Sequence, residues 1–290
     1  MSEGPVLNPL EDINLSVNPA VSDFASVRNI AKGSVIIMAS GSSAKDFPLE
    51  RFAGVPVITM NGAISMFTDT AIKPFFYICT DTSFPKQQPE LFAQALSNSQ
   101  HVALWSEQIA EVAGTCSAKL YPLQKAAGFS LKQSMSQGQS ACVRPRFAWN
   151  ARARSIGFSK DLSEGFFDAR TVAYAALQLA YHLGFSKVFL VGVDLNQAAG
   201  RFYETADSAK SPCGLDQHYE GRVLPSLKLM AERVVDERFA VFNLSAASRI
   251  PASVIPKITV EQAHSMVFRK GGARPRSLNA EHPQQQLMAG

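Results

Sequence analysis

The chain has 290 residues, of which 46% are hydrophobic and 18% charged, a composition that supports a sizeable core and excludes a globally disordered protein. No run of about 18 apolar residues occurs, and residues 1–18 lack the apolar stretch of a secretory signal, so neither a membrane span nor export is expected. The net charge of +4 lies mainly in residues 269–290, which hold four cations against one acid, and the nearly neutral remainder is unlike a nucleic-acid-binding protein.

Composition divides the chain into three parts. Residues 1–26 are polar and are predicted to form a leader, residues 27–268 carry the pattern of a single α/β domain, and residues 269–290 are predicted to be a disordered basic tail. The cysteines are scattered without a Cys-x-x-Cys pair, which favours free thiols in a reducing, cytoplasmic compartment over a disulfide framework or a zinc site. They are Cys79, Cys116, Cys142 and Cys213.

Short apolar runs alternate with helical stretches along the body of the chain. Strands are predicted at 34–39, 55–60, 74–79, 101–105, 187–193 and 240–244. Helices are predicted at 88–97, 166–183 and 222–238. The segment 116–160 mixes Gly, Ser, Gln and Arg with no clean period, and no structure is assigned to it. The alternation predicts an α/β fold with a Rossmann-like, doubly wound, mostly parallel sheet.

Small polar residues follow several of these predicted strands. They are Ser40, Gly41, Ser42 and Ser43 after the first strand, Asn61 after the second, Thr80, Asp81 and Thr82 after the third, and Asp194 after 187–193. Each group alone is typical of turns and helix caps. Because the carboxyl ends of parallel strands meet in one crevice, their coincidence indicates a ligand site, with serine hydroxyls and a helix N-terminus available to a phosphate.

Residues 196–219 are polar and too long for an ordinary connection, which is typical of an active-site lid or of disorder. The segment ends near His218, a candidate general base because an unperturbed imidazole has a pKa of about 6.5, although a surface histidine without a role is commoner. His182, in an apolar helix, is predicted to be core. No Asp-x-Asp follows a strand, and neither Gly-x-Ser-x-Gly nor His-Glu-x-x-His occurs, so no metal site is predicted.

Taken together, these segments resemble the bacterial sialyltransferases of glycosyltransferase family 42 and related lipopolysaccharide-core transferases that use CMP-activated 2-keto sugar acids. The similarity covers most of residues 33–250 and is strongest in the block 183–195 and in His218-Tyr-Glu-Gly221, which matches the family's His-Tyr-x-Gly. In the loop after the first strand only Gly41 and Ser43 match. One of two family tyrosines is found at Tyr203, and the other is replaced by Asn196.

The resemblance implies a GT-A-like variant of the fold and an inverting, metal-independent transfer of a sialic acid or Kdo from its CMP-activated donor to a glycan or glycolipid acceptor, with no cofactor. His218 would take the acceptor's proton, while Tyr203, helped by Arg201, would stabilise the departing CMP phosphate. The tail cations would contact the inner membrane peripherally, and a homo-oligomer is possible. These cations are Arg269, Lys270, Arg274 and Arg276.

Two other interpretations remain open at this stage. A pterin diphosphokinase-like protein would hold Mg²⁺ with Asp194 and Asp81 and transfer pyrophosphate from ATP. A catalytically inactive nucleotide-binding or scaffold protein would explain the incomplete first loop and the missing tyrosine.

Overall fold

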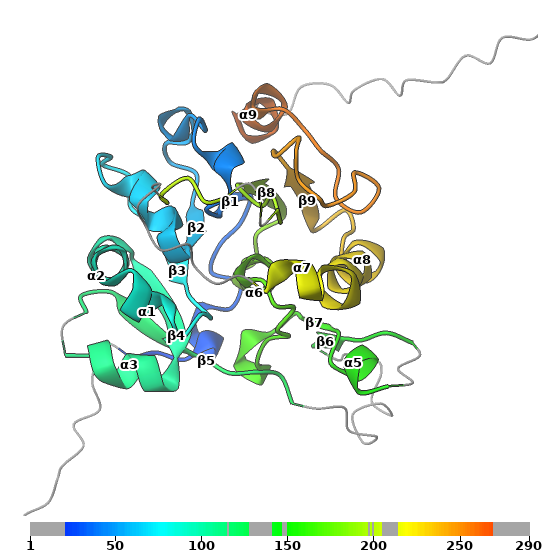
Figure 1. The fold of residues 1–290 in the computed structure, drawn as a ribbon, viewed down its shortest axis with the longest axis horizontal. Coiled ribbons are helices and arrows are strands. Elements are labelled where there is room, and N and C mark those ends of the chain that lie inside the picture. The colour runs from blue at the N-terminus through cyan, green and yellow to red at the C-terminus, as the bar shows by residue number, and fades with distance from the viewer. Residues whose placement is uncertain are drawn as a thin grey trace, which may run out of the picture.

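The structure of the protein is a computed structural model that describes residues 21–114, 116–127, 141–146, 150–196, 198, 200–204 and 214–268. Most of the predicted leader, the whole predicted tail and residues 197, 199 and 205–213 of the predicted lid lie outside the described residues. The described residues form a central sheet with helices on both faces (Figure 1).

Seven strands form one sheet in the order β5-β4-β3-β2-β1-β8-β9, and every neighbouring pair is parallel. Their bounds are β1 (Ser34–Met38), β2 (Val57–Met60), β3 (Phe76–Ile78), β4 (His101–Trp105), β5 (Lys119–Leu123), β8 (Lys187–Val191) and β9 (Ala240–Asn243). In the register, Ile36 of β1 lies between Val57 and Phe189. The predicted Rossmann-like, mostly parallel sheet is confirmed.

The two faces of β1 explain why this short β-branched run forms a central strand. Val35 and Ile37 belong to one hydrophobic cluster, Ile36 and Met38 to the other, and all four are fully buried. Helices α6 (Val172–Leu183) and α8 (Leu224–Arg233) cover the first face. The 3-10 helix η4 (Asn61–Phe67) and α2 (Pro89–Asn98) cover the second. A strand buried on both sides is the usual arrangement in parallel α/β sheets.

The remaining elements are short. The helices are η1 (Phe24–Val27), η2 (Ser42–Ala44), η3 (Leu49–Phe52), α1 (Phe84–Gln87), α3 (Ser106–Val112), α5 (Ala151–Arg154), η5 (Leu162–Glu164), α7 (Leu215–His218), a π-helical turn at Tyr219–Val223, and α9 (Val260–Phe268). A two-stranded antiparallel ribbon joins β6 (Cys142–Val143) to β7 (Phe158–Ser159). The described cysteines, Cys79, Cys116 and Cys142, form no disulfide.

Two predicted helices are shorter in the structure than expected, and one strand of the central sheet was not predicted. The helix predicted at 166–183 begins only at Val172, because Gly165 (φ 90°) and Arg170 (φ 62°) have left-handed backbone that interrupts a helix. The helix predicted at 222–238 ends at Arg233, since the Asp236 carboxylate accepts the amides of the next turn. Strand β5, within the unassigned segment 116–160, was missed.

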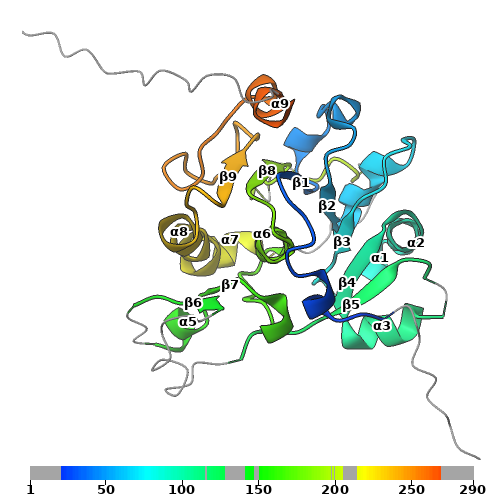
Figure 2. The ribbon, with the colours of Figure 1, turned by 180° about the vertical axis from the view of Figure 1, so that it is seen from behind.

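The first described residues belong to the body. Ser22 N donates to Leu120 O of β5 at 2.8 Å, and Figure 2 shows this segment, in dark blue, crossing toward β5 before it reaches β1. Phe24 and Val27 of η1 are buried in the same cluster as α6. The segment therefore contributes to the core on the face that α6 covers.

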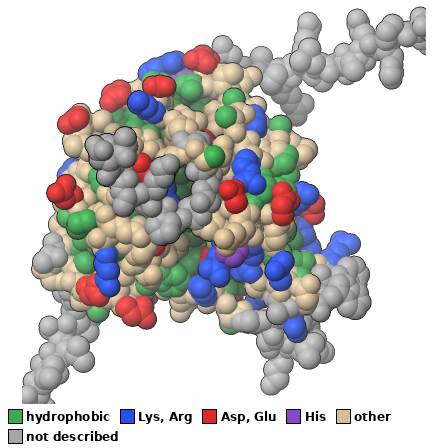
Figure 3. Space-filling model, viewed as in Figure 1, with side chains coloured by type: hydrophobic (Ala, Val, Ile, Leu, Met, Phe, Trp, Pro, Cys, Tyr) green, Lys and Arg blue, Asp and Glu red, His purple; other side chains and the backbone are tan. Residues whose placement is uncertain are grey.

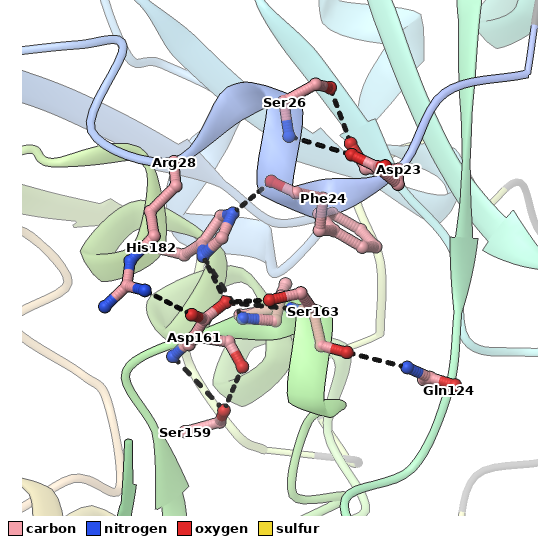
Figure 4. Close-up of polar contacts among 10 residues, drawn as sticks. Asp23, Phe24, Ser26, Arg28, Gln124, Ser159, Asp161, Ser163 and His182 are labelled. Carbon is pink, nitrogen blue, oxygen red and sulfur yellow. Dashed lines mark hydrogen bonds and ion pairs between the residues drawn. The ribbon is translucent and has the colours of Figure 1, made fainter. Parts of the chain in front are cut away.

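A buried polar network fastens η1 to α6 (Figure 4). His182 Nε2 donates to Phe24 O at 2.7 Å, and the Leu162 amide donates to His182 Nδ1 at 3.1 Å, which is the pattern of a neutral imidazole. Burial lowers the pKa of His182, outweighing the raising effects of the Phe24 carbonyl and of Asp161. Asp161 accepts from Arg28 at 2.5 Å. The predicted core position of His182 is confirmed.

Candidate functional site

The sheet changes direction between β1 and β8. From β1 the chain proceeds outward through β2, β3, β4 and β5, and then returns to the other side of β1 as β8. Two glycines let the loops after these strands meet: Gly41 N donates to Gly192 O at 2.9 Å, and a Cβ on Gly41 would lie only 2.4 Å from that oxygen. In open α/β sheets, the crevice at such a switch point is where ligands bind.

A cavity of about 790 Å³ lies at this switch point. Most of the predicted site residues line it: Ser40, Gly41, Asn61, Thr80, Asp81, Asp194, Asn196, Arg201 and His218. The structure therefore brings together residues from four strand ends and from the segment that follows β8. Four other predicted residues do not line the cavity: Ser42, Ser43, Thr82 and Tyr203.

The serines after β1 hold Asp194 rather than facing the cavity. The Asp194 carboxylate, in a residue that is 5% exposed, accepts from Ser43 N at 3.0 Å, from Ser42 Oγ at 3.4 Å and from the Ser43 hydroxyl. Ser245, just after β9, donates to it at 2.5 Å. These hydroxyls satisfy a buried carboxylate, which would otherwise be costly to bury, and their contact with a phosphate stays a prediction.

Asn61 lines the cavity and carries a buried, unsatisfied acceptor. It follows β2 with a left-handed backbone (φ 44°), and its Oδ1 is buried without a hydrogen-bond partner among the described residues. A buried acceptor without a donor costs roughly 1–3 kcal/mol. A ligand with an N–H or O–H group would remove that cost, so Asn61 is the strand-end residue best suited to accept a hydrogen bond from a ligand.

Arg201 and Tyr203 form one unit beside the first loop. Arg201 forms a β-bridge with Gly41, and its guanidinium donates to the Tyr203 hydroxyl at 3.1 Å and pairs with Glu204 at 3.6 Å. The Tyr203 ring packs so closely on Gly62 that a Cβ there would lie 2.2 Å from it. Tyr203 thus lies behind the cavity wall, and Arg201 is the member of the pair that lines the cavity.

His218 is the last residue of α7 and precedes the π-helical turn, an irregularity that is frequent at functional sites. A residue that sequence reasoning missed, Arg249, secures this segment. Its guanidinium donates to Leu195 O at 3.3 Å, pairs with Asp216, and lies 4.0 Å from the ring centre of Tyr219. No pattern in the sequence predicts this role for Arg249, because it lies in a loop after β9, far along the chain from His218.

His218 also lines a second pocket, of about 710 Å³. Three residues belong to both spaces: Asp168, Arg170 and His218. Figure 3 shows lysine and arginine side chains gathered around a histidine on this face. A base that borders two pockets can remove a proton from a molecule in one while that molecule attacks a molecule in the other.

Two further observations concern the predicted absence of metal and membrane segments. In the part of the chain that the structure describes, no three His, Cys, Asp or Glu residues cluster as metal ligands would. The kinase interpretation needed Asp194 and Asp81, but Asp194 accepts from three serines and Asp81 Oδ1 already accepts from the amide and hydroxyl of Ser83. Among the described residues, no helix has the length and apolar character to cross a membrane.

The parallel sheet and the cavity at its switch point define a Rossmann-like α/β protein with a ligand site at the strand carboxyl ends. Residues 21–261 match the family described as 3-deoxy-D-manno-octulosonic acid transferase WaaZ, and the chain belongs to this family. The predicted resemblance to lipopolysaccharide-core transferases and the predicted class of enzyme, a glycosyltransferase, are confirmed. Membership also argues against the pterin diphosphokinase alternative.

Two relatives are described as probable 3-deoxy-manno-octulosonic acid transferases. The protein from Salmonella typhimurium is 28% identical over 246 residues, which is 80% of this chain and 89% of that protein. The one from Escherichia coli is 27% identical over 263 residues, covering 84% and 90% respectively. Among solved structures, the sialyltransferase CstII from Campylobacter jejuni in complex with the substrate analogue CMP-3FNeuAc is similar, with a TM-score of 0.40, 15% identity, and coverage of 77% of this chain and 84% of that one.

Proposed function

We propose that this protein transfers a 3-deoxy-D-manno-octulosonic acid (Kdo) residue from a CMP-activated donor to an acceptor in lipopolysaccharide synthesis. The observation that carries the proposal is the position of His218, between a cavity at the switch point and a second pocket. The names of the two relatives support Kdo over sialic acid as the sugar. The reaction is an inverting single displacement that uses no metal.

The cavity suits an anionic donor although five carboxylates line it. All five are matched by donors from the protein: Asp168 by Lys125 at 3.3 Å, Asp216 by Arg249, Glu204 by Arg201, Asp194 by three serines, and Asp81 by Ser83. The amino end of α6, a helix of 12 residues, also opens on the cavity with no side-chain cap. Its partial positive charge favours a phosphate or carboxylate there.

In the proposed reaction, the donor's cytidine contacts the strand ends at Asn61 and Thr80. The acceptor hydroxyl approaches from the second pocket, His218 takes its proton as the oxygen attacks the anomeric carbon, and CMP leaves with the bonding electrons. Arg201, oriented by its bond to Tyr203, stabilises the charge on the departing phosphate. The segment 196–219 acts as a lid that excludes water and limits hydrolysis of the donor.

The acceptor in this proposal is a glycolipid on the cytoplasmic leaflet, which the protein reaches as a peripheral protein. The cations in the tail, Arg269, Lys270, Arg274 and Arg276, lie outside the described residues. Cationic residues near an anionic membrane surface contribute roughly 1 kcal/mol each to binding. Co-sedimentation with anionic vesicles tests this contact, since full-length protein should pellet more than a chain ending at Phe268, and equal pelleting would contradict it.

The function itself is tested by a transfer assay with the full-length protein. CMP-Kdo and CMP-sialic acid are compared as donors, with a Kdo-containing lipopolysaccharide fragment as acceptor, and the product is detected by mass. We expect transfer from CMP-Kdo, unchanged by EDTA, with an anomeric configuration opposite to that of the donor by NMR. Binding of CMP without transfer from either donor would instead support the non-catalytic nucleotide-binding interpretation.

A further inference from the structure

The second pocket is strongly cationic. Six of its lining residues are basic: Lys125, Arg144, Arg152, Arg154, Arg170 and Arg222. Among the described residues that line it, Asp168 is the only acid. With histidine neutral, these residues give six positive charges against one negative charge, on a protein whose whole net charge is only +4. Charge of one sign gathered in a concave site attracts ligands of the opposite sign.

Two of these arginines build the pocket. Arg144 donates to Ala127 O at 2.6 Å and to Arg154 O at 3.2 Å, and it lies 4.7 Å from the ring centre of Phe167. Arg222 donates to Asp168 O at 2.6 Å and also to the Ser155 hydroxyl. Burial lowers the pKa of Arg222, as does the nearby charge of Arg170. The walls are therefore fixed by guanidinium groups that bond to backbone carbonyls.

Three other arginines have no such role. Among the described residues, the side chains of Arg152, Arg154 and Arg170 form no hydrogen bond or ion pair with the protein. All three are exposed and line the pocket. Arg170 adopts a left-handed backbone (φ 62°), a conformation that costs a non-glycine residue energy and that is found at functional sites. Like-charged side chains gathered without partners favour a ligand with more than one negative group.

We propose that this pocket, which we call the cationic pocket, binds the acceptor through at least two anionic groups, carboxylates or phosphates. The inference rests on the proposed function, because it assigns the acceptor's chemical class to the pocket on the far side of His218. Arg170 borders both the cavity and the pocket. An acceptor held by its anionic groups therefore presents a neighbouring hydroxyl to His218, and a neutral acceptor is not held.

Calorimetry with three soluble probes tests this proposal on the full-length protein. The probes are a Kdo disaccharide with free carboxylates, the same disaccharide with its carboxyls reduced to alcohols, and a bisphosphorylated glucosamine disaccharide. We expect one or both anionic probes to bind and the reduced probe to bind at least about tenfold more weakly. Binding of the Kdo disaccharide identifies carboxylates as the recognised groups, whereas binding of the other anionic probe identifies phosphates. Equal binding of the charged and reduced disaccharides would overturn the proposal.

The double variant Arg152→Gln/Arg154→Gln tests the pocket itself, since neither side chain forms a hydrogen bond or ion pair with the described residues. It should weaken binding of the anionic probe about tenfold and leave CMP affinity unchanged. Arg238→Gln, an exposed arginine before the amino end of β9, is the control and should change neither. If the double variant binds the anionic probe as the wild type does, the cationic pocket is not the site. Because calorimetry measures binding and not transfer, the result can be interpreted even if the protein proves not to catalyse the proposed reaction. Conversely, transfer to charged and neutral acceptors at equal rates would refute this inference and leave the proposed function intact.

Discussion

The guanidinium of Arg249 lies 4.0 Å from the ring centre of Tyr219 and pairs with Asp216, three residues earlier in the same helical segment. His218 lies between these two contacts in the sequence. Because the same guanidinium also donates to Leu195 O, just beyond β8, it joins the segment carrying the proposed base to the central sheet. Arg249 is therefore a positioning residue for His218 in the proposed reaction.

Replacing Arg249 should affect turnover more than nucleotide binding. Arg249→Ala removes a carbonyl contact, an ion pair and a cation–π contact, and we expect about 1–2 kcal/mol less stability and a lower kcat with nearly unchanged affinity for CMP. Arg249→Lys retains the charge but not the planar group, and should recover part of the loss. Chemical denaturation, kinetics and CMP titration separate these effects. A parallel loss of CMP affinity and kcat would contradict the positioning role.

His218→Ala should lower kcat roughly 10²- to 10⁴-fold, which is the usual contribution of a positioned general base. CMP affinity should be nearly unchanged, because the imidazole acts on the acceptor. Tyr203→Phe should cost less, since the tyrosine acts through Arg201. Steady-state kinetics with the competent donor measure both variants. If His218→Ala retains more than about a third of wild-type turnover, well short of the smallest expected loss, His218 is not the base.

The contact between the loops after β1 and β8 should tolerate no methyl group. In Gly41→Ala the new Cβ would lie 2.4 Å from Gly192 O and 2.5 Å from Asp194 Oδ2, so the two strand ends must separate. We expect more than about 1 kcal/mol of destabilisation, as for other overpacked sites, together with weaker CMP binding. Gly114→Ala is the control, because no atom of the described residues lies within 4 Å of its Cβ position. Thermal shift with and without CMP reports both effects, and equal behaviour of the two variants would refute the argument.

Mild acid should destabilise the protein through two histidines, the buried His182 and the half-buried His101. Burial lowers the pKa of His182 below its ordinary 6.5. As the pH falls through 6.5, the unfolded chain gains a proton at this position while the native imidazole stays neutral, so the stability that this group contributes is lost as the pH falls. Burial and the charge of Lys119 also lower the pKa of His101, which acts in the same direction.

The variants His182→Gln and His101→Gln test this pH dependence. Each should reduce the slope of unfolding free energy against pH between about pH 7 and 5, whatever its effect on absolute stability. The double variant should have the smallest slope. Urea denaturation at several pH values gives the slopes directly. A double variant as pH-sensitive as the wild type would place the effect elsewhere.

The sequence predicted the sheet well because its strands are short β-branched runs buried on both faces, as at Val35 to Met38. The strand-end residues were also found, since parallel strands bring their carboxyl ends together. The partners of those residues were not predictable. The Ser42 and Ser43 hydroxyls point to Asp194, more than 150 positions later in the chain, and only the folded register of β1 against β8 reveals this.

The cationic pocket was missed for a related reason. Arg144, Arg152 and Arg154 come from the segment without a clean period, whereas Arg170 precedes α6 and Arg222 lies in the π-helical turn. Counting charge along the chain gave an almost neutral body, and averaging over residues conceals a cluster that only folding assembles. A high local density of arginine in an otherwise unassigned segment was the available signal.

The π-helical turn at Tyr219–Val223 determines the direction in which His218 points around the helix axis. Residues 215–233 form one continuous helical run, in which this turn is wider than the α-helical turns on either side. Each residue of an α-helix advances the chain by about 100° around the axis. Deleting one residue from the turn would therefore allow an unbroken α-helix but rotate α7 by about that angle relative to α8. The helical segment would be more regular, but His218 would no longer face both pockets. This local irregularity therefore sets the direction in which the proposed base points.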